Sequence, residues 1–209
     1  MLLNLPRLNF NFIMEYKAKN YDNLLGLNGF SDGLLQNHFA LYNGYVNNFN
    51  KLNDILSNAE KNEKFGTPEY AELNRRLGWE WNGMRLHELY FENLTKENQK
   101  LKDDSELLKK IIEEWGSYNS FEKGFKALSM TRGVGWIILY YDKIGNRLFN
   151  VWINEHDVGH LSGAVPLLVL DVFEHAFMLD YGIKRNGYIE TFWNIVNWEE
   201  AEKRFKENL

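Results

Sequence analysis

The stretch "VPLLVLDVFEHAFMLDY" (165–181) joins an apolar run to a group of charged residues. The run is typical of a buried strand, and Asp171, Glu174 and His175 follow it at once. Charged side chains at such a place are costly unless they are paired or bind a metal ion. A carboxylate and an imidazole from a strand end can converge on one ion, and a sulfur-free ligand set suits iron or manganese. The alternative is that Asp171 caps a helix and His175 is a hydrogen-bonded core histidine.

The composition is that of an ordinary soluble globular protein with one domain or two small ones. The chain has 209 residues, of which 44% are hydrophobic and 15% aromatic. Its net charge of −5 and the lack of a basic cluster argue against a nucleic-acid partner. The absence of cysteine excludes disulfides, thiolate catalysis and zinc-thiolate sites, and cytoplasmic residence is expected. Residues 1–16 lack a signal-peptide core and no later segment resembles a membrane span, so no membrane association is expected.

Two long amphipathic helices are predicted in the first half of the chain. Apolar residues recur at helical spacing over residues 31–61, with Ser31 or Asp32 as the cap. The second helix covers residues 67–94, with Thr67 as its cap followed by a proline at the first helical position. Together they imply a helical hairpin. Shorter helices are expected to start at Ser105 and Ser120.

The second half of the chain changes character. Residues 135–143 and 146–157 are aromatic and β-branched runs separated by the turn signal "DKIGN", which predicts a β-hairpin. Residues 165–171 supply a third strand, and residues 174–185 and 186–209 look helical. The predicted fold class is therefore α+β.

The predicted organisation has two parts, an all-α part followed by a part that contains the sheet. The first is a long α-helical hairpin domain, residues 1–98. The second, residues 99–209, is an α/β domain with a three-stranded antiparallel sheet.

Two further histidines bear on the site. His38 and His87 each lie in the middle of a predicted helix among apolar or aromatic neighbours. A lone histidine on an apolar face is usually structural. Two of them on partner helices, together with Asp171 and His175, indicate a four-ligand metal site.

These regions resemble a known family. The run "DVFEHAFMLDYGIKRNGYIETFWNIVNWEEAEKRF" (171–205) is similar to the carboxy-terminal signature of the iron/manganese superoxide dismutases, D-V-W-E-H-A-Y-Y followed by N-V-I-N-W. "YVNNFN" (45–50) resembles the family's first helix and "HELYFENL" (87–94) its second, while Gly116 to Phe121 resemble its domain junction. The resemblance covers nearly the whole chain.

The resemblance implies that His38, His87, Asp171 and His175 hold one iron or manganese ion per chain, with solvent as a fifth ligand. Glu174 would instead cross a homodimer interface and hydrogen-bond the partner's His175. The implied reaction converts superoxide to dioxygen and hydrogen peroxide by alternate one-electron reduction and oxidation of the metal.

The resemblance also implies roles for residues around the metal. Tyr45 matches the family's gateway tyrosine and Arg185 its substrate-funnel arginine, for which a solvated helix-end arginine is the alternative. Trp136 matches a pocket tryptophan, and Phe173 replaces a tryptophan in the apolar wall.

The first departure from the family concerns helix register. Counted back from Tyr45, the first ligand of the family would fall on Asn37, and asparagine is a poor ligand. We infer that one helical residue is missing, as when a π-bulge is absent, and keep His38.

The second departure concerns the glutamine that hydrogen-bonds the metal-bound solvent. One of its two usual positions is Gly83, and the other falls at Glu155. We favour the adjacent His156, with His160 as runner-up; the alternative is that both are surface histidines. A histidine here favours iron or dual-metal use over strict manganese use.

The third departure lies at the expected subunit gateway, where Met178 replaces a tyrosine and Leu41 or Tyr42 replaces its histidine partner. A rebuilt gateway motivates one alternative, a non-catalytic metal-binding or structural dimer. A second alternative is a mononuclear iron oxygenase with two histidines and one carboxylate, in which His38 is free.

Overall fold

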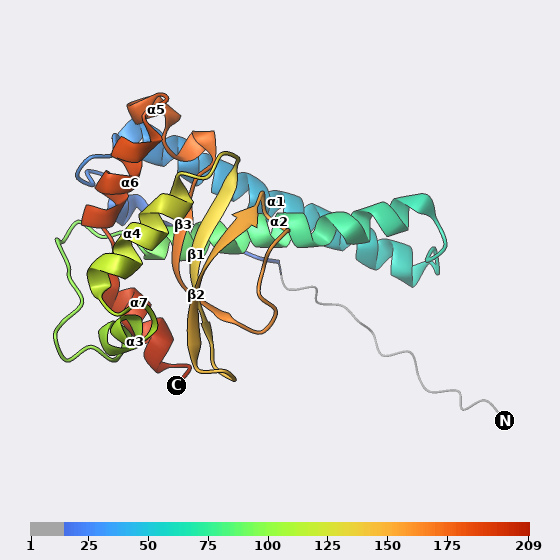
Figure 1. The fold of residues 1–209 in the computed structure, drawn as a ribbon. Coiled ribbons are helices and arrows are strands. Elements are labelled where there is room, and N and C mark those ends of the chain that lie inside the picture. Colours follow the sequence, from blue (N-terminus) through green and yellow to red (C-terminus); the bar gives the residue numbers. More distant parts are fainter. Residues whose placement is uncertain (1–14) are drawn as a thin grey trace.

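The computed structural model describes residues 15–209 (Figure 1). The prediction about a signal segment concerns residues 1–16, of which residues 1–14 lie outside the described residues. In chain order the elements are η1 (Asp22–Leu24), α1 (Asp32–Lys61), α2 (Pro68–Glu92), α3 (Glu106–Trp115), α4 (Tyr118–Ser129), β1 (Gly135–Asp142), β2 (Arg147–Asn154), β3 (Val165–Asp171), η2 (Glu174–Ala176), α5 (Met178–Tyr181), α6 (Arg185–Asn194) and α7 (Trp198–Lys206). None of the helices in residues 15–209 is long and apolar enough to cross a membrane.

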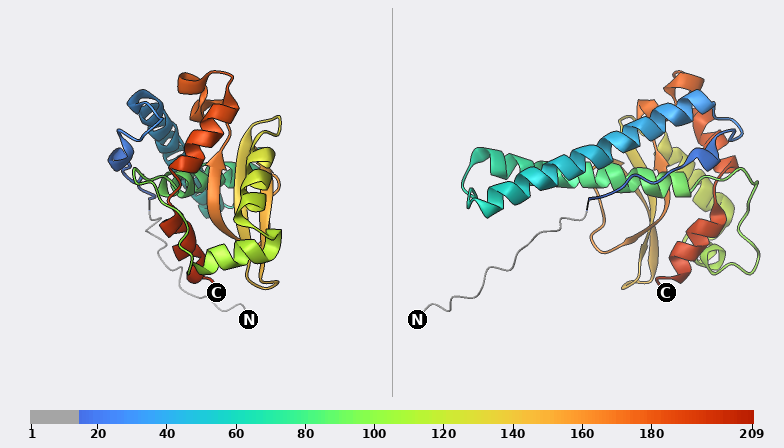
Figure 2. Two further views of the ribbon diagram at one scale, coloured as in Figure 1. Left: turned by 60° about the vertical axis from the view of Figure 1, so that its left-hand side comes forward. Right: turned by 180° about the vertical axis from the view of Figure 1, so that it is seen from behind.

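The two long helices form the predicted hairpin, and its distal half projects from the body of the molecule (Figures 1 and 2). The Ser31 hydroxyl accepts a hydrogen bond from the backbone N–H of Leu34 at 3.0 Å, so Ser31 is the cap of α1. Thr67 caps α2 in the same way, by accepting from the N–H of Tyr70 at 3.2 Å. Both sequence-based caps are confirmed, and each satisfies an N–H that the first helical turn leaves unpaired.

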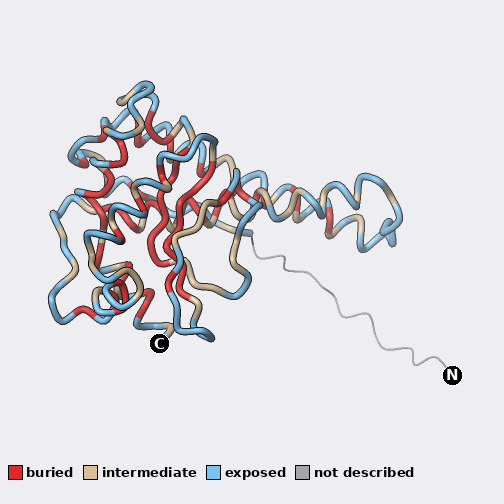
Figure 3. The backbone as a smooth tube through the Cα atoms, viewed as in Figure 1, coloured by how far each residue is buried: buried red, intermediate tan, exposed pale blue. Residues whose placement is uncertain are grey.

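The three strands form one antiparallel sheet in the order β2-β1-β3, which confirms the predicted fold class. The central strand β1 places Trp136 opposite Asp171 of β3. Helix α4 packs on β1 and β2 and helix α3 on β2, while α2 and α7 pack on β3 (Figure 2). The buried residues concentrate in the sheet and in the helix faces that meet it, whereas the projecting end of the hairpin is largely exposed (Figure 3).

The prediction of a continuous helix over residues 174–185 is wrong. The chain instead forms the short 3-10 turn η2 and the single turn α5, separated at Phe177 and ended by Gly182 with φ 53°. His175 therefore lies in a 3-10 turn that starts three residues after the end of β3.

Two other predicted helices need correction. The fourth helix begins at Tyr118, because the hydroxyl of Ser117 accepts from the N–H of Ser120 at 3.1 Å; Ser117 and not Ser120 is the cap. The predicted helix over 186–209 is divided into α6 and α7, since Val196 between them forms a β-bridge with Leu94. The proposed boundary between residues 98 and 99 lies between α2 and α3 and stays a prediction.

A buried amide fixes the end of α2 against β3. The Asn93 side chain is fully buried; its oxygen accepts from the Val169 N–H at 2.9 Å and from the Arg204 guanidinium at 3.1 Å. Its amide nitrogen donates to the carbonyl of Leu167 at 3.3 Å. These bonds hold the helix that carries His87 against the strand that ends in Asp171, and so set the relative positions of two candidate ligands.

Candidate metal centre

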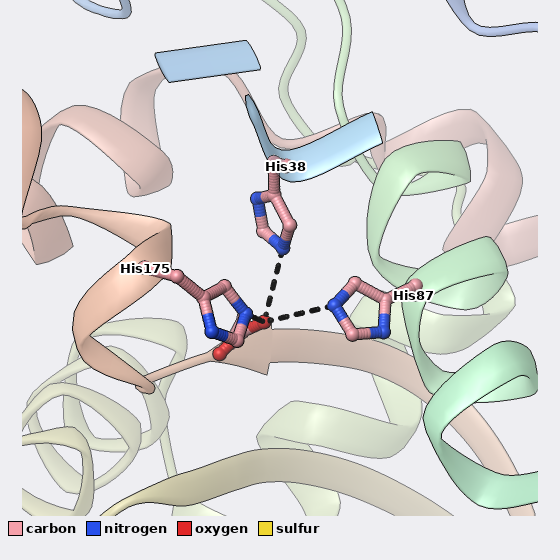
Figure 4. A group of neighbouring side chains, drawn as sticks. His38, His87 and His175 are labelled. Carbon is pink, nitrogen blue, oxygen red and sulfur yellow. Dashed lines mark hydrogen bonds and ion pairs between the residues drawn. The ribbon is translucent and has the colours of Figure 1, made fainter. Parts of the chain in front are cut away.

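Four elements bring one side chain each to a single point. His38 comes from α1, His87 from α2, Asp171 from the end of β3 and His175 from η2. One potential ligand atom from each lies within 4.8 Å of all the others. Figure 4 shows the rings of His38, His87 and His175 pointing toward one another. Three of the four side chains are buried, and that of His175 is 24% exposed.

The carboxylate of Asp171 is the centre of the group. Its Oδ2 lies 3.2 Å from Nε2 of His38, 3.1 Å from Nε2 of His175 and 3.8 Å from Nε2 of His87. Its Oδ1 accepts from the N–H of Phe173 at 2.8 Å, which fixes the carboxylate plane. The four residues therefore present three imidazole nitrogens around one carboxylate oxygen.

The orientation of His87 shows that a cation fits here. Its Nδ1–H donates to the carbonyl of Gly83 at 2.5 Å, so the neutral ring carries its proton on Nδ1. Nε2 then turns a lone pair toward the Asp171 carboxylate, and it has no hydrogen-bond partner among residues 15–209. Two electron-rich atoms that face each other in a buried site repel, and a metal ion between them removes the conflict.

The protonation states of these residues also suit metal binding. Burial raises the pKa of Asp171, but attraction to His175 and hydrogen bonds from His175 and His38 outweigh it and hold that pKa far below its usual range. Burial lowers the pKa of His38, and it lowers that of His87 further. A deprotonated carboxylate and neutral imidazoles are the forms that bind metal.

The pKa of His175 is shifted in the opposite direction to those of His38 and His87. Burial lowers its pKa, but the charge and hydrogen bond of Asp171 outweigh burial and raise it overall. Metal binding must therefore displace a proton from this ring, which makes metal affinity fall as the solution becomes more acidic.

A second group of polar side chains lies beside the cluster. The Tyr45 hydroxyl is 2.7 Å from Nε2 of His156, and the Trp136 indole N–H donates to Nδ1 of the same ring at 3.1 Å. An indole N–H can only donate, so Nδ1 accepts and the neutral His156 carries its proton on Nε2. Nε2–H then donates to the oxygen of Tyr45, which leaves the phenol proton free for another acceptor.

Burial keeps both members of this pair neutral near pH 7. It lowers the pKa of His156 to about 4 and raises the pKa of Tyr45 to about 12. Tyr45 therefore keeps its phenol proton near pH 7. Its ring also stacks on the candidate ligand His87, with centroids 5.2 Å apart.

Gly83 leaves the space that the Tyr45 ring fills. A Cβ atom built at Gly83 would overlap Cδ1 of Tyr45 and lie 2.6 Å from its Cε1. Residue 83 therefore cannot carry a side chain while Tyr45 lies against α2. This agrees with the sequence, in which glycine occupies one of the two usual positions of the family's glutamine.

We predict that Gly83→Ala displaces the Tyr45 ring. In an exposed helix interior this substitution stabilises by about 1 kcal/mol, and Gly78→Ala, with nothing within 4 Å of its Cβ, is the matched control. We expect Gly78→Ala to raise the melting temperature without changing activity. Gly83→Ala should lose that gain and lower the activity of the metal-loaded protein by about tenfold. Thermal unfolding and an activity assay of both proteins decide; equal behaviour of the two would contradict the role given to Tyr45.

Aromatic side chains complete the walls. Phe173 stacks on His156 and on His175 with centroids 4.7 and 5.2 Å apart. Trp136 meets the His87 ring edge-on at 5.0 Å. The sequence identified these two wall residues but not Trp79, whose ring lies edge-on to His156 at 4.9 Å.

Two residues beside the site, Trp79 and Tyr188, were not identified from the sequence, and only the first of them could have been found from its spacing. Residues 79, 83 and 87 follow one another at intervals of four on α2, so Trp79 shares a face with His87 and could have been found from that spacing. Tyr188, whose hydroxyl donates to the backbone carbonyl of Asp171 at 2.7 Å, carried no such signal.

Two predicted site residues lie apart from the cluster. Arg185 donates to the carbonyls of Thr131, Gly133 and Val172 at 2.7 to 3.0 Å, so its guanidinium is held by backbone at the end of β3. Glu174 is exposed and is not among the residues whose ligand atoms converge. Both line the same surface depression, beside Arg132 and Val134.

Comparisons with known proteins agree with this geometry. The family model for the carboxy-terminal domain of iron/manganese superoxide dismutases matches residues 102–204. "Superoxide dismutase [Mn] 2" of Haloferax volcanii is 33% identical over 83% of this chain and 85% of its own length. The chain belongs to the iron/manganese superoxide dismutase family. Within the family, "Superoxide dismutase [Fe]" of Aquifex pyrophilus is 35% identical, over 88% of this chain and 87% of that protein.

The relatives leave the choice of metal open. A third one, "Superoxide dismutase [Fe]" of Sulfolobus acidocaldarius, is 33% identical over 80% of this chain and 81% of its own length. Relatives named for manganese and for iron therefore share similar identities with this member of the superoxide dismutase family.

Proposed function

We propose that the chain is a superoxide dismutase that binds one iron or manganese ion with His38, His87, Asp171 and His175. The observation that carries the proposal is the buried Nε2 of His87, which finds no hydrogen-bond partner in the described part of the chain, residues 15–209, and faces the carboxylate of Asp171 at 3.8 Å. His38 lies 3.2 Å from the same carboxylate, so nothing favours the oxygenase alternative in which His38 is free.

When bound there, iron or manganese supplies a one-electron couple, which lets two superoxide anions become dioxygen and hydrogen peroxide. The peroxide also needs two protons, and the chain holds a proton source at Tyr45. His156 donates to the Tyr45 oxygen, so the phenol proton is directed away from His156 and stays available for donation. With burial raising its pKa to about 12, Tyr45 keeps that proton at neutral pH.

We assign His156 as the histidine that replaces the family's glutamine. It contacts Tyr45, Trp136 and Phe173, all of which border the four ligands. Both ring nitrogens of His160 are engaged elsewhere, with Tyr140 and with the backbone. A neutral histidine in this place supports iron or dual-metal use, because hydrogen bonds around the ligands tune both solvent pKa and redox potential.

We infer a homodimer in which Glu174 reaches the partner's His175. Glu174 is exposed, and the following turn presents the neighbouring apolar residues Met178 and Leu179 to solvent at 47% and 62% exposure. Tyr42 is fully buried, so the exposed Leu41 is the residue that takes the place of the family's cross-subunit histidine. Sedimentation tests the inference; a fully active monomer would contradict it.

The function is tested on two samples of the same protein, one loaded with iron alone and one with manganese alone. We expect each to hold one metal per chain and the iron sample to dismutate superoxide. Metal content is measured alongside the rate, so that low occupancy is not mistaken for low activity. If both samples are fully loaded and neither turns over, the non-catalytic alternative replaces this proposal.

A further inference from the structure

The loop between β2 and β3 is tied to β1 at two places. Trp136 donates from its indole nitrogen to Nδ1 of His156 at 3.1 Å, and the Tyr140 hydroxyl contacts Nδ1 of His160 at 2.8 Å. Positions 136 and 140 are four apart on a strand that pairs regularly with β2, so both side chains leave the same face. The two histidines are also four apart in the loop.

A third hydrogen bond links the two histidines. Nε2 of His160 lies 2.9 Å from the backbone carbonyl of His156. A carbonyl oxygen can only accept, so Nε2 of His160 is the donor, and the Nδ1 of the neutral ring accepts from the Tyr140 hydroxyl. The donor and the acceptor of both hydrogen bonds, from Tyr140 to His160 and from His160 to His156, thus follow from the groups involved.

The backbone at this place needs such support. Glu155, directly before His156, has φ 52°, in the left-handed region that non-glycine residues seldom adopt. Gly159, directly before His160, has φ 112°, and a Cβ there would lie 2.7 Å from the carbonyl of Trp152. Strained backbone of this kind persists only where surrounding contacts determine it.

We propose that His160 is a positioning residue for the reaction. It holds the carbonyl of His156, while Trp136 holds Nδ1 of the His156 ring. Between these two restraints, Nε2–H of His156 is aimed at the Tyr45 hydroxyl 2.7 Å away. His160 touches neither the ligands nor Tyr45, and it acts through His156 alone. The expected effect of His160 on turnover rests on the proposed function, whereas its effect on the His156 ring does not.

The test separates position from activity by reading the His156 ring directly. Nitrogen-15 spectra of the metal-free protein distinguish protonated from unprotonated ring nitrogens. The chain has five histidines, and the signals that disappear in His156→Gln are those of His156. In the unaltered protein we expect Nδ1 of His156 to be unprotonated and Nε2 protonated. His160→Phe should shift these signals or mix the two tautomers, and in the loaded enzyme it should lower activity by about tenfold.

Three further variants sharpen the test. His160→Gln keeps one donor and one acceptor and should restore the His156 signals and most of the activity. Tyr140→Phe removes the donor to Nδ1 of His160 but keeps the bond from Nε2 of His160 to the carbonyl of His156, and it should give an intermediate effect. Val158→Ala, in the same loop with its side chain 60% exposed, is the control and should change nothing.

Each outcome bears on one claim. If His160→Phe lowers only the melting temperature, with the His156 signals and the rate unchanged, His160 is merely structural and the proposal is wrong. If that protein does not fold, unchanged His156 signals in Tyr140→Phe overturn the proposal. If the signals respond but the unaltered loaded protein has no dismutase activity, the positioning role stands and the proposed function fails.

Discussion

The Asp171→Asn protein is expected to bind neither iron nor manganese and to lose dismutation to the background rate. The carboxylate is the single acidic group of the candidate ligand set, and three imidazole nitrogens surround its Oδ2 at 3.1 to 3.8 Å. An asparagine has the same shape but no charge, and its amide oxygen is a weaker ligand. Metal content per chain after loading and removal of free metal is the primary measurement.

The control for this substitution is Asp54→Asn, which removes the same charge from an exposed position on α1. It should keep full metal content and activity, because Asp54 lies far along the helix from His38. Full metal content in Asp171→Asn would contradict the ligand assignment, whatever the activity. Full metal content without activity in the unaltered protein would instead contradict the proposed function and leave the site intact.

The parts of the fold that could be predicted are those with local causes. Ser31, Thr67 and Ser105 each cap the helix that their side chains begin, because the capping bond spans only three residues. The segment after Asp171 could not be predicted in the same way. Its residues favour a helix, but the backbone leaves helical geometry at Phe177 and again at Gly182, which has φ 53°, so only the short turns η2 and α5 form.

The candidate site also has parts that could be predicted from the sequence and parts that could not. The resemblance to the family identified His38, His87, Asp171 and His175, and the structure gathers them. The tautomer of His156 could not be predicted from the sequence, because it depends on the indole of Trp136, which lies 20 residues away on β1. The same holds for Arg185, whose bonds to three backbone carbonyls arise only when the ends of β1 and β3 come together.

The metal-free protein is expected to lose about 3 kcal/mol of stability through His156 alone as the pH falls from 6.5 to 4. The pKa of this ring is about 4 in the folded protein, below its value of 6.5 in the unfolded chain. Between these values the unfolded chain binds a proton that the folded protein does not, so acid favours unfolding. His38 and His87, whose pKa values are also lowered, act in the same direction.

Two groups modify this dependence, and their signs differ. The raised pKa of His175 contributes stability that is complete at low pH and is lost as the pH rises through its folded value, so it opposes the effect of His156. The depressed pKa of Asp171 contributes stability that is present above its unfolded value near 4 and is lost below it, so it adds to the acid sensitivity only under strongly acidic conditions.

Because these contributions overlap, the experiment must remove one of them. Urea unfolding of the metal-free protein at pH 7, 5.5 and 4.5 is compared with that of His156→Gln, which keeps a polar side chain but cannot titrate. The slope of stability against pH should be steeper in the unaltered protein. His160→Gln is the control, since it also removes a histidine from this loop but leaves His156 buried. Equal slopes in the unaltered and His156→Gln proteins would mean that His156 is not held neutral. The acceptor that its Nδ1 offers to the Trp136 indole would then be lost, because both nitrogens of an imidazolium carry protons.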